Sequence, residues 1–382
     1  MAGLYIHIPF CSQRCSYCDF FFVTTRKSHA GFVEALCREI RLRGEAYGGL
    51  EPLDTIYFGG GTPSRLALAD IERIIEAANT SFDTSSVQET TLEINPEDAS
   101  DEYLNGLRIL GVDRLSVGIQ SFFDSDLKFM NRVHDAAMGK KVISKIREAG
   151  FSNFSIDLIF GLPEQPEEYW AANLEIAAAF EVPHISTYNL TIEKGTPLNN
   201  QVERGLVVPV DDEDAASQFQ FTMNYLIEQG FEHYEISSFA RPGFRARHNH
   251  RYWNHANYIG CGPSAHSFWW KGLPAQRWSN VKNLGQYEAL LTQHVVPVEQ
   301  KEDLDLDTLA DEYIMLRLRT ADGLNLEELE ERYGVDLLVE RVGELANLEE
   351  GGFIRPIRNQ TVKLTDLGKT VCDSVTATLL PD

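Results

Sequence analysis

The first half of the chain alternates short β-rich runs with longer amphipathic helical patterns, from residue 4 to about residue 190. The helical patterns carry apolar residues at helical spacing and cover residues 28–48, 67–82, 135–150 and 167–182. The β-rich runs are LYIHIPF from residue 4, LDTIYFGG from 53, TTLEINP from 90, RLSVGIQS from 114, FSIDLIFGLP from 154 and HISTYNLT from 184. Six βα units in succession predict an α/β protein with a parallel sheet and right-handed crossovers, either doubly wound or a complete or partial barrel.

Polar or unusual residues collect where these runs end. Three cysteines follow the first run, GGGTP follows the second, Glu93 and Asn95 lie on the third, Gln120 ends the fourth and Asp157 lies on the fifth. In either parallel architecture, ligands bind at the carboxyl ends of the strands. The sequence therefore predicts one site at this edge, built from several strands.

The pattern changes after about residue 200. Residues 209–230 have an acidic start and an amphipathic body that predict a helix, residues 232–240 predict a strand, and residues 247–270 form an irregular stretch rich in aromatic residues and histidine. From about residue 300, three helices and a β-ribbon predict a small winged-helix-like unit. Many such units bind DNA, but this one is strongly acidic, which favours a packing or lid role.

Charge and hydropathy exclude several classes of protein. The chain has 382 residues, of which 43% are apolar, and this is enough for a large globular core. A formal net charge of −23 argues against a nucleic-acid partner, because phosphate backbones are bound by clustered lysine and arginine. No apolar run is long enough to span a bilayer, and no leader precedes the first strand. We therefore expect a cytoplasmic protein.

The six cysteines divide into a crowded group and a scattered group. Cys11, Cys15 and Cys18 fall within eight residues, whereas Cys37, Cys261 and Cys372 are far apart. A cytoplasmic chain does not keep structural disulfides, so we expect ligands in the first group and buried small apolar residues in the second.

The spacing C-x3-C-x2-C limits what the crowded group can bind. Structural zinc prefers four ligands in two pairs, and no second pair follows; a redox C-x-x-C would leave Cys11 without a role. Unliganded buried thiols agree poorly with polar neighbours such as Gln13 and Arg14. Three thiolates can instead hold three irons of a four-iron cluster and leave the fourth iron open to another ligand.

These residues resemble the radical S-adenosylmethionine superfamily, whose signature is C-x3-C-x-aromatic-C after the first strand of a partial (β/α)6 barrel. Tyr17 supplies the aromatic residue, and GGGTP at residues 59–63 resembles the segment of the family that meets the methionyl amino group. Glycines let the backbone approach a ligand closely, although a tight strand-to-helix turn would also use them. The resemblance implies a partial barrel over residues 1–200, a connecting region over 201–298 and a C-terminal helical domain over 299–382.

Further motifs resemble the oxygen-independent coproporphyrinogen III oxidase group over nearly the whole chain. These are EINPE, RLSVGIQSF, NRVHD, IDLIFGLPEQ and GCGPSAHSF. The resemblance implies that S-adenosylmethionine is contacted by Tyr5, Gly60, Gly61, Thr62, Glu93, Gln120, Arg132 and Asp157. Carboxylates suit the amino group and ribose hydroxyls of this ligand, and an arginine suits its carboxylate. For a single acidic residue, helix capping or a surface role is an equally good explanation.

Two departures from the oxidases point to a related branch, the HemW heme chaperones. The oxidases carry a further cysteine where this chain has Phe20, and they begin with a long extension before the first strand. In addition, HNHRYW at residues 248–253 resembles the H-N-x-x-Y-W heme motif of that branch, formed here by His248, Asn249, Tyr252 and Trp253.

The motif suits heme chemically, because an imidazole can bind iron and aromatic faces can stack on a porphyrin. His250, His255 and His266 follow nearby, so the motif leaves open which histidine contacts iron. Taken alone, the motif is more typical of an aromatic loop whose histidines bond to backbone carbonyls than of a heme site.

The resemblance implies a heme chaperone that binds a 4Fe-4S cluster, S-adenosylmethionine and heme. It would pass heme from a donor protein to acceptor hemoproteins such as respiratory enzymes, and it would reach a membrane only through protein partners. If chemistry occurs, the reduced cluster would cleave the sulfonium to methionine and a 5′-deoxyadenosyl radical. The rival hypothesis is an active coproporphyrinogen III dehydrogenase, and a third is a radical enzyme with another substrate.

Overall fold

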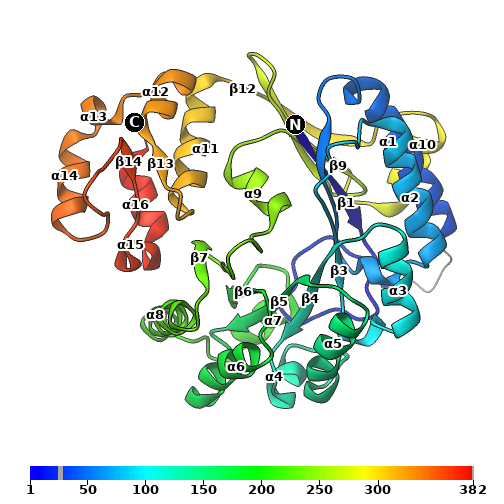
Figure 1. Cartoon of the computed structure of the whole chain (residues 1–382), viewed down its shortest axis with the longest axis horizontal. Helices are drawn as coiled ribbons and strands as arrows, with labels where there is room; N and C mark the ends of the chain where they lie inside the picture. Colours follow the sequence, from blue (N-terminus) through cyan, green and yellow to red (C-terminus); the bar gives the residue numbers. More distant parts are fainter. Residues whose placement is uncertain (25–28, 381–382) are drawn as a thin grey trace.

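The computed structural model describes residues 1–24 and 29–380, and its centre is one twelve-stranded sheet (Figure 1). The first six strands run parallel in chain order, and each pairs with the next. They are β1 (Ala2–Ile8), β2 (Leu53–Gly60), β3 (Glu89–Ile94), β4 (Arg114–Gln120), β5 (Asn153–Phe160) and β6 (His184–Asn189). The sheet curls without closing, which confirms the predicted partial barrel.

Helices cover the outer face of the six strands, as crossover connections require (Figure 1). They are α1 (Ala30–Tyr47), α2 (Leu68–Ser81), α3 (Asp101–Ile109), α4 (Asp124–Phe129), α5 (Ala136–Glu148) and α6 (Glu167–Ala179), with short 3-10 turns at Pro63–Arg65 and Pro96–Asp98. The side chains of Ser100 and Asp135 cap α3 and α5 by accepting backbone N–H bonds. Ile71, Ile74 and Ala78 form the buried stripe of α2.

The strands alternate between an apolar outer face and a polar inner face. On β3, Leu92 and Ile94 pack in the core under the helices, whereas Glu89, Thr91 and Glu93 occupy the alternate positions. The other strands follow the same alternation, with inner residues such as Thr55, Arg114, Ser116, Asp157 and Ser186. The barrel interior is therefore rich in polar groups.

Residues 201–298, expected as a connecting region, extend the sheet at both edges. One edge continues through β9 (Tyr258–Cys261), β10 (His266–Trp269), β11 (Ala275–Asn280) and β12 (Val298–Leu304), and the other through β8 (Ser238–Ala240) and β7 (Glu232–Glu235). The helices of this region are α7 (Pro197–Glu203), α8 (Asp212–Glu228), α9 (Arg247–Trp253) and α10 (Leu284–Thr292). Strand β9 pairs in parallel with β1.

Two local expectations for this region are wrong. The single strand expected over residues 232–240 is an antiparallel pair, β7 and β8. The stretch 247–270, expected to be irregular, contains α9, β9 and β10. The aromatic and histidine-rich sequence of this stretch has no clear helical or strand periodicity of apolar residues. The strand β9 forms there because it pairs with β1, which is remote in the sequence.

The C-terminal unit has its own apolar core, which also packs on the sheet through residues such as Phe268 and Leu304. Its helices are α11 (Leu306–Leu318), α12 (Leu326–Tyr333), α13 (Leu337–Glu340), α14 (Val342–Glu350), α15 (Asp366–Thr370) and α16 (Cys372–Leu379), and β13 (Leu324–Asn325) pairs with β14 (Thr361–Val362). The predicted ribbon is present as bridges from Ile354 to Leu364 and from Arg358 to Thr361. In the described residues, no helix is both long and apolar enough to cross a membrane.

Candidate functional site

A cavity of about 580 Å³ lies at the carboxyl ends of the parallel strands. Its walls bring together the predicted ligand residues Cys11, Cys15, Cys18, Gly60, Gly61, Thr62, Glu93, Gln120, Arg132 and Asp157. Tyr5 is the exception, because it does not line this cavity and packs instead against Tyr57 behind it, with ring centroids 6.1 Å apart. Residues at or just after the ends of β1 to β5 thus converge at the edge where the sequence predicted one site.

The loop that carries the three cysteines is held by two distant segments. Ser16 donates its backbone N–H to the carbonyl of Met130 (3.1 Å) and its hydroxyl to the carbonyl of Phe129 (3.1 Å). The side chain of Asn131 donates to the carbonyl of Arg14 (2.7 Å), and the backbone N–H of Leu198 donates to the carbonyl of Ser16 (2.8 Å). These bonds fix the cysteine backbone before any ligand binds.

The three thiols suit a cluster better than a single metal ion. Within the part of the chain that the structure describes, no three or more His, Cys, Asp or Glu side chains converge closely enough to hold one ion. Mononuclear zinc needs such convergence, whereas an iron–sulfur cluster takes each thiolate on a different iron. Exposed Phe20, which is 66% accessible, lines the same cavity.

Burial acts on two of the three cysteines of this loop. Burial raises the pKa of Cys18 to about 11, and burial also raises the pKa of Cys11. A metal centre ligated through Cys11 and Cys18 would take them as thiolates, so its binding would release their protons.

The glycine segment closes against the cysteine loop. At Gly60 the backbone has a φ of +109°, and an added Cβ would lie 2.5 Å from Nδ1 of His7. An added Cβ at Gly61 would lie 2.9 Å from the carbonyl carbon of Pro9, and the N–H of Gly61 donates to the carbonyl of Ile8 (2.8 Å). Gly60 and Gly61 therefore lie too close to neighbouring residues of the chain itself to carry a side chain. This need for glycine exists whether or not a ligand also approaches the backbone here.

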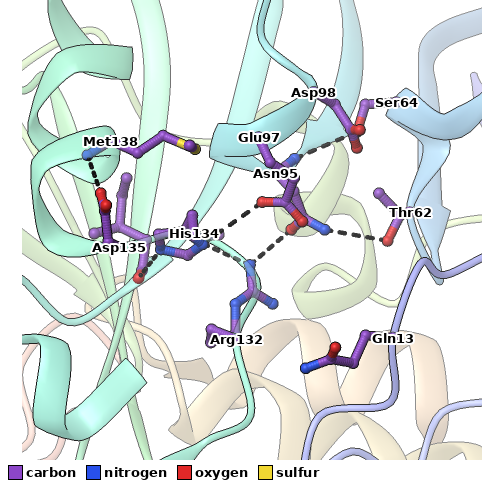
Figure 2. Close-up of polar contacts among 12 residues, drawn as sticks. Gln13, Thr62, Ser64, Asn95, Glu97, Asp98, Arg132, His134, Asp135 and Met138 are labelled. Atoms are coloured by element: carbon purple, nitrogen blue, oxygen red, sulfur yellow. Dashed lines mark hydrogen bonds and ion pairs between the residues drawn. The ribbon is translucent and has the colours of Figure 1, made fainter. Parts of the chain in front are cut away.

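Asn95 joins the glycine segment to Arg132, as Figure 2 shows. Its Nδ2 donates to Thr62 Oγ1 (3.3 Å), and its Oδ1 accepts from Arg132 Nη2 (2.8 Å). The guanidinium also donates to the carbonyl of Gly118 (2.8 Å), and its Nη1 lies 3.6 Å from Cys15 Sγ. Asn95 was noted at a strand end but was not predicted as a site residue.

The guanidinium of Arg132 keeps an unused donor. In the described residues, its Nε is buried and has no hydrogen-bond partner. A buried unsatisfied donor is costly, and the carboxylate of a bound ligand would satisfy it. The cavity also contains the carboxyl groups of Glu93 and Asp157, which can accept from an ammonium or from hydroxyls. The residues present therefore suit a ligand with a carboxylate, an ammonium and hydroxyls, as in S-adenosylmethionine.

Gln120 and Asp157 occupy the far wall of the cavity. The backbone of Gln120 adopts a φ of +66° after a register irregularity in β4, an uncommon conformation that is frequent at functional sites. Ser116 donates its hydroxyl to Asp157 Oδ2 (3.2 Å). Burial raises the pKa of Asp157 to about 6.

Glu93 accepts two hydrogen bonds inside the cavity. Tyr57 donates its hydroxyl to Glu93 Oε1 (2.8 Å), and the N–H of Gly60 donates to Oε2 (3.2 Å). Burial raises the pKa of Glu93 to about 7, although the bond from Tyr57 opposes the shift. The charge of Glu93 thus changes close to neutral pH.

We predict that the affinity of the reconstituted protein for S-adenosylmethionine falls about fivefold between pH 7 and pH 6, because the ammonium of the ligand needs ionised Glu93. Isothermal titration across this range measures the affinity. In Tyr57→Phe the midpoint should move to higher pH, since a bond that lowers the pKa of Glu93 is lost. An unchanged pH profile in Glu93→Gln would contradict the assignment.

The predicted heme motif lies in the barrel interior, at the amino-terminal halves of the strands. Both ring nitrogens of His248 are engaged: Nδ1 with Thr55 Oγ1 (2.8 Å) and Nε2 with the hydroxyl of Tyr252 (2.8 Å). The ring is 1% exposed and stacks on Tyr57 at 5.0 Å between centroids. Tyr57 therefore separates His248 from Glu93 and from the cavity.

The other residues of the heme motif and the nearby histidines differ from His248 in burial and in bonding partners. Asn249 and Trp253 are half-buried on α9. His255 is buried, with Nδ1 bonded to the hydroxyl of Tyr333 (3.1 Å) and Nε2 to Glu312 (3.2 Å). His250 lies 3.6 Å from Asp322, and His266 is exposed on β10.

Comparison with known proteins agrees with this geometry. The model of the radical SAM superfamily matches residues 5–177, and the model of the HemN C-terminal domain matches residues 304–371. The heme chaperone HemW of Lactococcus lactis subsp. lactis (strain IL1403) is 34% identical over 350 residues, which cover 90% of this chain and 89% of that protein. The heme chaperone HemW of Bacillus subtilis (strain 168) is 32% identical over 378 residues, 98% of each chain.

Among solved structures, the coproporphyrinogen III oxidase (HemN) from Escherichia coli, a radical SAM enzyme, superposes with a TM-score of 0.85. The match covers 99% of this chain and 90% of that chain at 24% identity. This likeness confirms the fold that the motifs predicted.

Proposed function

The chain belongs to the HemW family of heme chaperones within the radical SAM superfamily, and from this premise we propose that it binds a 4Fe-4S cluster, S-adenosylmethionine and heme. It then delivers the heme to acceptor hemoproteins such as respiratory enzymes. One observation supports the binding of the cluster and S-adenosylmethionine. A single cavity contains the three thiols together with the carboxyl and guanidinium groups that suit S-adenosylmethionine.

Cys11, Cys15 and Cys18 hold the cluster in this proposal. Once bound, the cluster supplies an electron and an open iron position to the sulfonium ligand. The chain's own residues orient that ligand. Glu93 and backbone carbonyls of the glycine segment accept hydrogen bonds from its amino group, and Arg132 pairs with its carboxylate through its free donor.

The remaining predicted contacts complete the ligand's surroundings. Asp157 and Gln120 meet the ribose hydroxyls from the far wall, and Thr62 holds the glycine segment through Asn95. Tyr5 supports Tyr57 from behind, because its side chain does not line the cavity.

For heme, we propose the motif formed by His248, Asn249, Tyr252 and Trp253. Burial lowers the pKa of His248 to about 3, so its imidazole is neutral, as iron ligation requires. In the described conformation the ring cannot reach iron until its bonds to Thr55 and Tyr252 break. Heme binding at His248 therefore implies that α9 leaves its place in the barrel.

We predict that His248→Ala abolishes the Soret shift on heme titration and stops heme transfer to an apo-acceptor. Thr55→Val is the matched control, since it breaks the same buried bond but leaves the imidazole in place. This control should bind heme at least as well as the wild type. If both variants bind heme as the wild type does, with unchanged melting temperatures, His248 is not the heme ligand and the heme site lies outside this motif.

A second candidate is coproporphyrinogen III dehydrogenation, favoured by the fold shared with the Escherichia coli oxidase. Phe20 weighs against it, because this exposed aromatic side chain replaces the additional cysteine of the oxidases. We place the chaperone in the cytoplasm, where a heme donor and the acceptors, some of them bound to membranes, would be its partners.

A further inference from the structure

A polar pair lies beside Arg132, formed by Glu97 and His134 (Figure 2). Glu97 lies on the 3-10 turn that follows β3, two residues after Asn95, and it lines the large cavity. His134 lies just before α5, two residues after Arg132, and its ring is 0% exposed. The two segments that bring Asn95 and Arg132 together therefore also carry this pair.

The hydrogen-bonding pattern fixes one ring nitrogen of His134. Its Nε2 lies 3.0 Å from the carbonyl oxygen of Ile119, and a carbonyl only accepts hydrogen bonds, so Nε2 carries a hydrogen. Its Nδ1 lies 3.6 Å from Glu97 Oε2. Among the described residues, both of these atoms are buried and have no hydrogen-bond partner. A neutral ring with hydrogen on Nε2 and an ionised carboxylate would thus present two acceptors to each other.

One proton held between the two side chains removes this conflict. Two buried acceptors without a donor are costly, whereas a proton between them allows a charge-assisted hydrogen bond. Burial acts to raise the pKa of Glu97, but its other interactions, led by the one with His134, outweigh burial and hold this pKa below the ordinary value of a glutamate. The negative charge of Glu97 is thus directed to His134.

Arg132 shows the consequence of this pairing. Its guanidinium donates to Asn95 Oδ1 and to the carbonyl of Gly118, which are neutral acceptors. Within residues 1–24 and 29–380 it forms no ion pair with a carboxylate, and its buried Nε has no partner. Glu97 nevertheless lines the same cavity and follows Asn95 on the same turn. A carboxylate at this place with no other partner would bind the free donor and block a ligand's carboxylate.

We propose that His134 is a positioning residue for ligand binding: it holds the carboxylate of Glu97 away from Arg132 and so keeps the guanidinium available for the carboxylate of S-adenosylmethionine. This inference rests on the proposed function, which assigns that ligand to the cavity. His134 does not itself line the cavity, so it acts on the ligand only through the other two side chains. Its effect is specific to ligands that carry a carboxylate.

Two substitutions of His134 separate its two contacts. In His134→Gln the amide takes the place of Nε2 and can still donate to the carbonyl of Ile119, but the contact of Nδ1 with Glu97 is lost. In His134→Asn the amide takes the place of Nδ1 and can donate to Glu97, but the bond to Ile119 is lost. The second variant is therefore the matched control for the first.

Isothermal titration of the anaerobically reconstituted protein uses two probes, S-adenosylmethionine and its decarboxylated form. We expect His134→Gln to bind S-adenosylmethionine about tenfold more weakly than the wild type and to bind the decarboxylated form as the wild type does. His134→Asn should match the wild type for both probes. The double variant His134→Gln/Glu97→Gln should regain the affinity of the wild type for S-adenosylmethionine, because a neutral side chain at position 97 does not compete for Arg132.

The outcomes separate this inference from the proposed function. If the wild type does not bind S-adenosylmethionine, the proposed binding of this ligand fails and the inference fails with it. If the wild type binds it, the inference alone is overturned by any of three results: unchanged binding in His134→Gln, equal weakening of both probes, or no recovery in the double variant. If His134→Gln does not fold, His134→Asn decides, since unchanged affinity for S-adenosylmethionine supports the inference and weaker binding overturns it.

Discussion

Replacing any one of Cys11, Cys15 and Cys18 by alanine is expected to leave the anaerobically reconstituted protein without a stable four-iron cluster. In the proposed site each thiolate binds a different iron, so the loss of one would expose a second iron and remove one of three anchors. The wild type should hold about four irons per chain, and each variant should lose most of them and the associated visible absorbance. Iron and sulfide analysis with electron paramagnetic resonance of the reduced protein measures this.

Cys372→Ala is the matched control for this experiment. Cys372 is buried in the C-terminal unit and does not line the cavity, so its variant should keep the full cluster. A cluster of normal iron content in Cys15→Ala would contradict the assignment of the three thiols.

Glu39→Leu is expected to lower the free energy of unfolding by about 3–5 kcal/mol, because it leaves a buried arginine without its partner. Glu39 on α1 is 0% exposed and pairs with Arg43 at 3.3 Å. It also accepts hydrogen bonds from the N–H of Gly262 (2.8 Å), Asn280 Nδ2 (2.8 Å) and the hydroxyl of Tyr287 (2.7 Å). This carboxylate therefore connects α1 by hydrogen bonds to the sheet edge formed by β9 to β12 and to α10.

Chemical denaturation of the variant and the wild type measures this effect. Glu34→Leu is the control on the same helix, because Glu34 makes exposed ion pairs with Arg38 and Arg73 and should contribute less than about 1 kcal/mol. Equal unfolding energies for the two variants would show that the buried network does not support the fold as described.

The parallel core of the fold could be predicted from the sequence because its signals are local. Each β-rich run ends close to the observed strand, and β2 is Leu53–Gly60 as expected. The spacing of Cys11, Cys15 and Cys18 fixes a loop after β1, and parallel topology then places it beside the glycine segment and Glu93. The residues predicted for the cluster and for S-adenosylmethionine, other than Tyr5, meet in one cavity for this reason.

The added strands could not be predicted, because their partners are remote in the sequence. Gly3 of β1 pairs with Tyr258 of β9, and no local pattern encodes such a contact. Asn95 was likewise missed as a site residue, since its role is to connect Thr62 with Arg132, two residues that the fold alone brings together.

The heme motif shows a different limit of sequence reasoning. The types of its residues suit heme, but the sequence gives no information on the direction of the His248 side chain. The structure places this ring between Thr55 and Tyr252, against Tyr57. The hydroxyl of Tyr57 in turn donates to Glu93, so movement of α9 would alter the carboxyl that we propose for S-adenosylmethionine.

The most direct test measures heme transfer and coproporphyrinogen III conversion in one reconstituted sample. The anaerobic protein carries its cluster and is supplied with S-adenosylmethionine, heme, an apo-acceptor and coproporphyrinogen III. We predict that heme passes to the acceptor and that no protoporphyrinogen IX accumulates. Steady formation of protoporphyrinogen IX without transfer of heme would contradict the account and identify the protein as an oxidase.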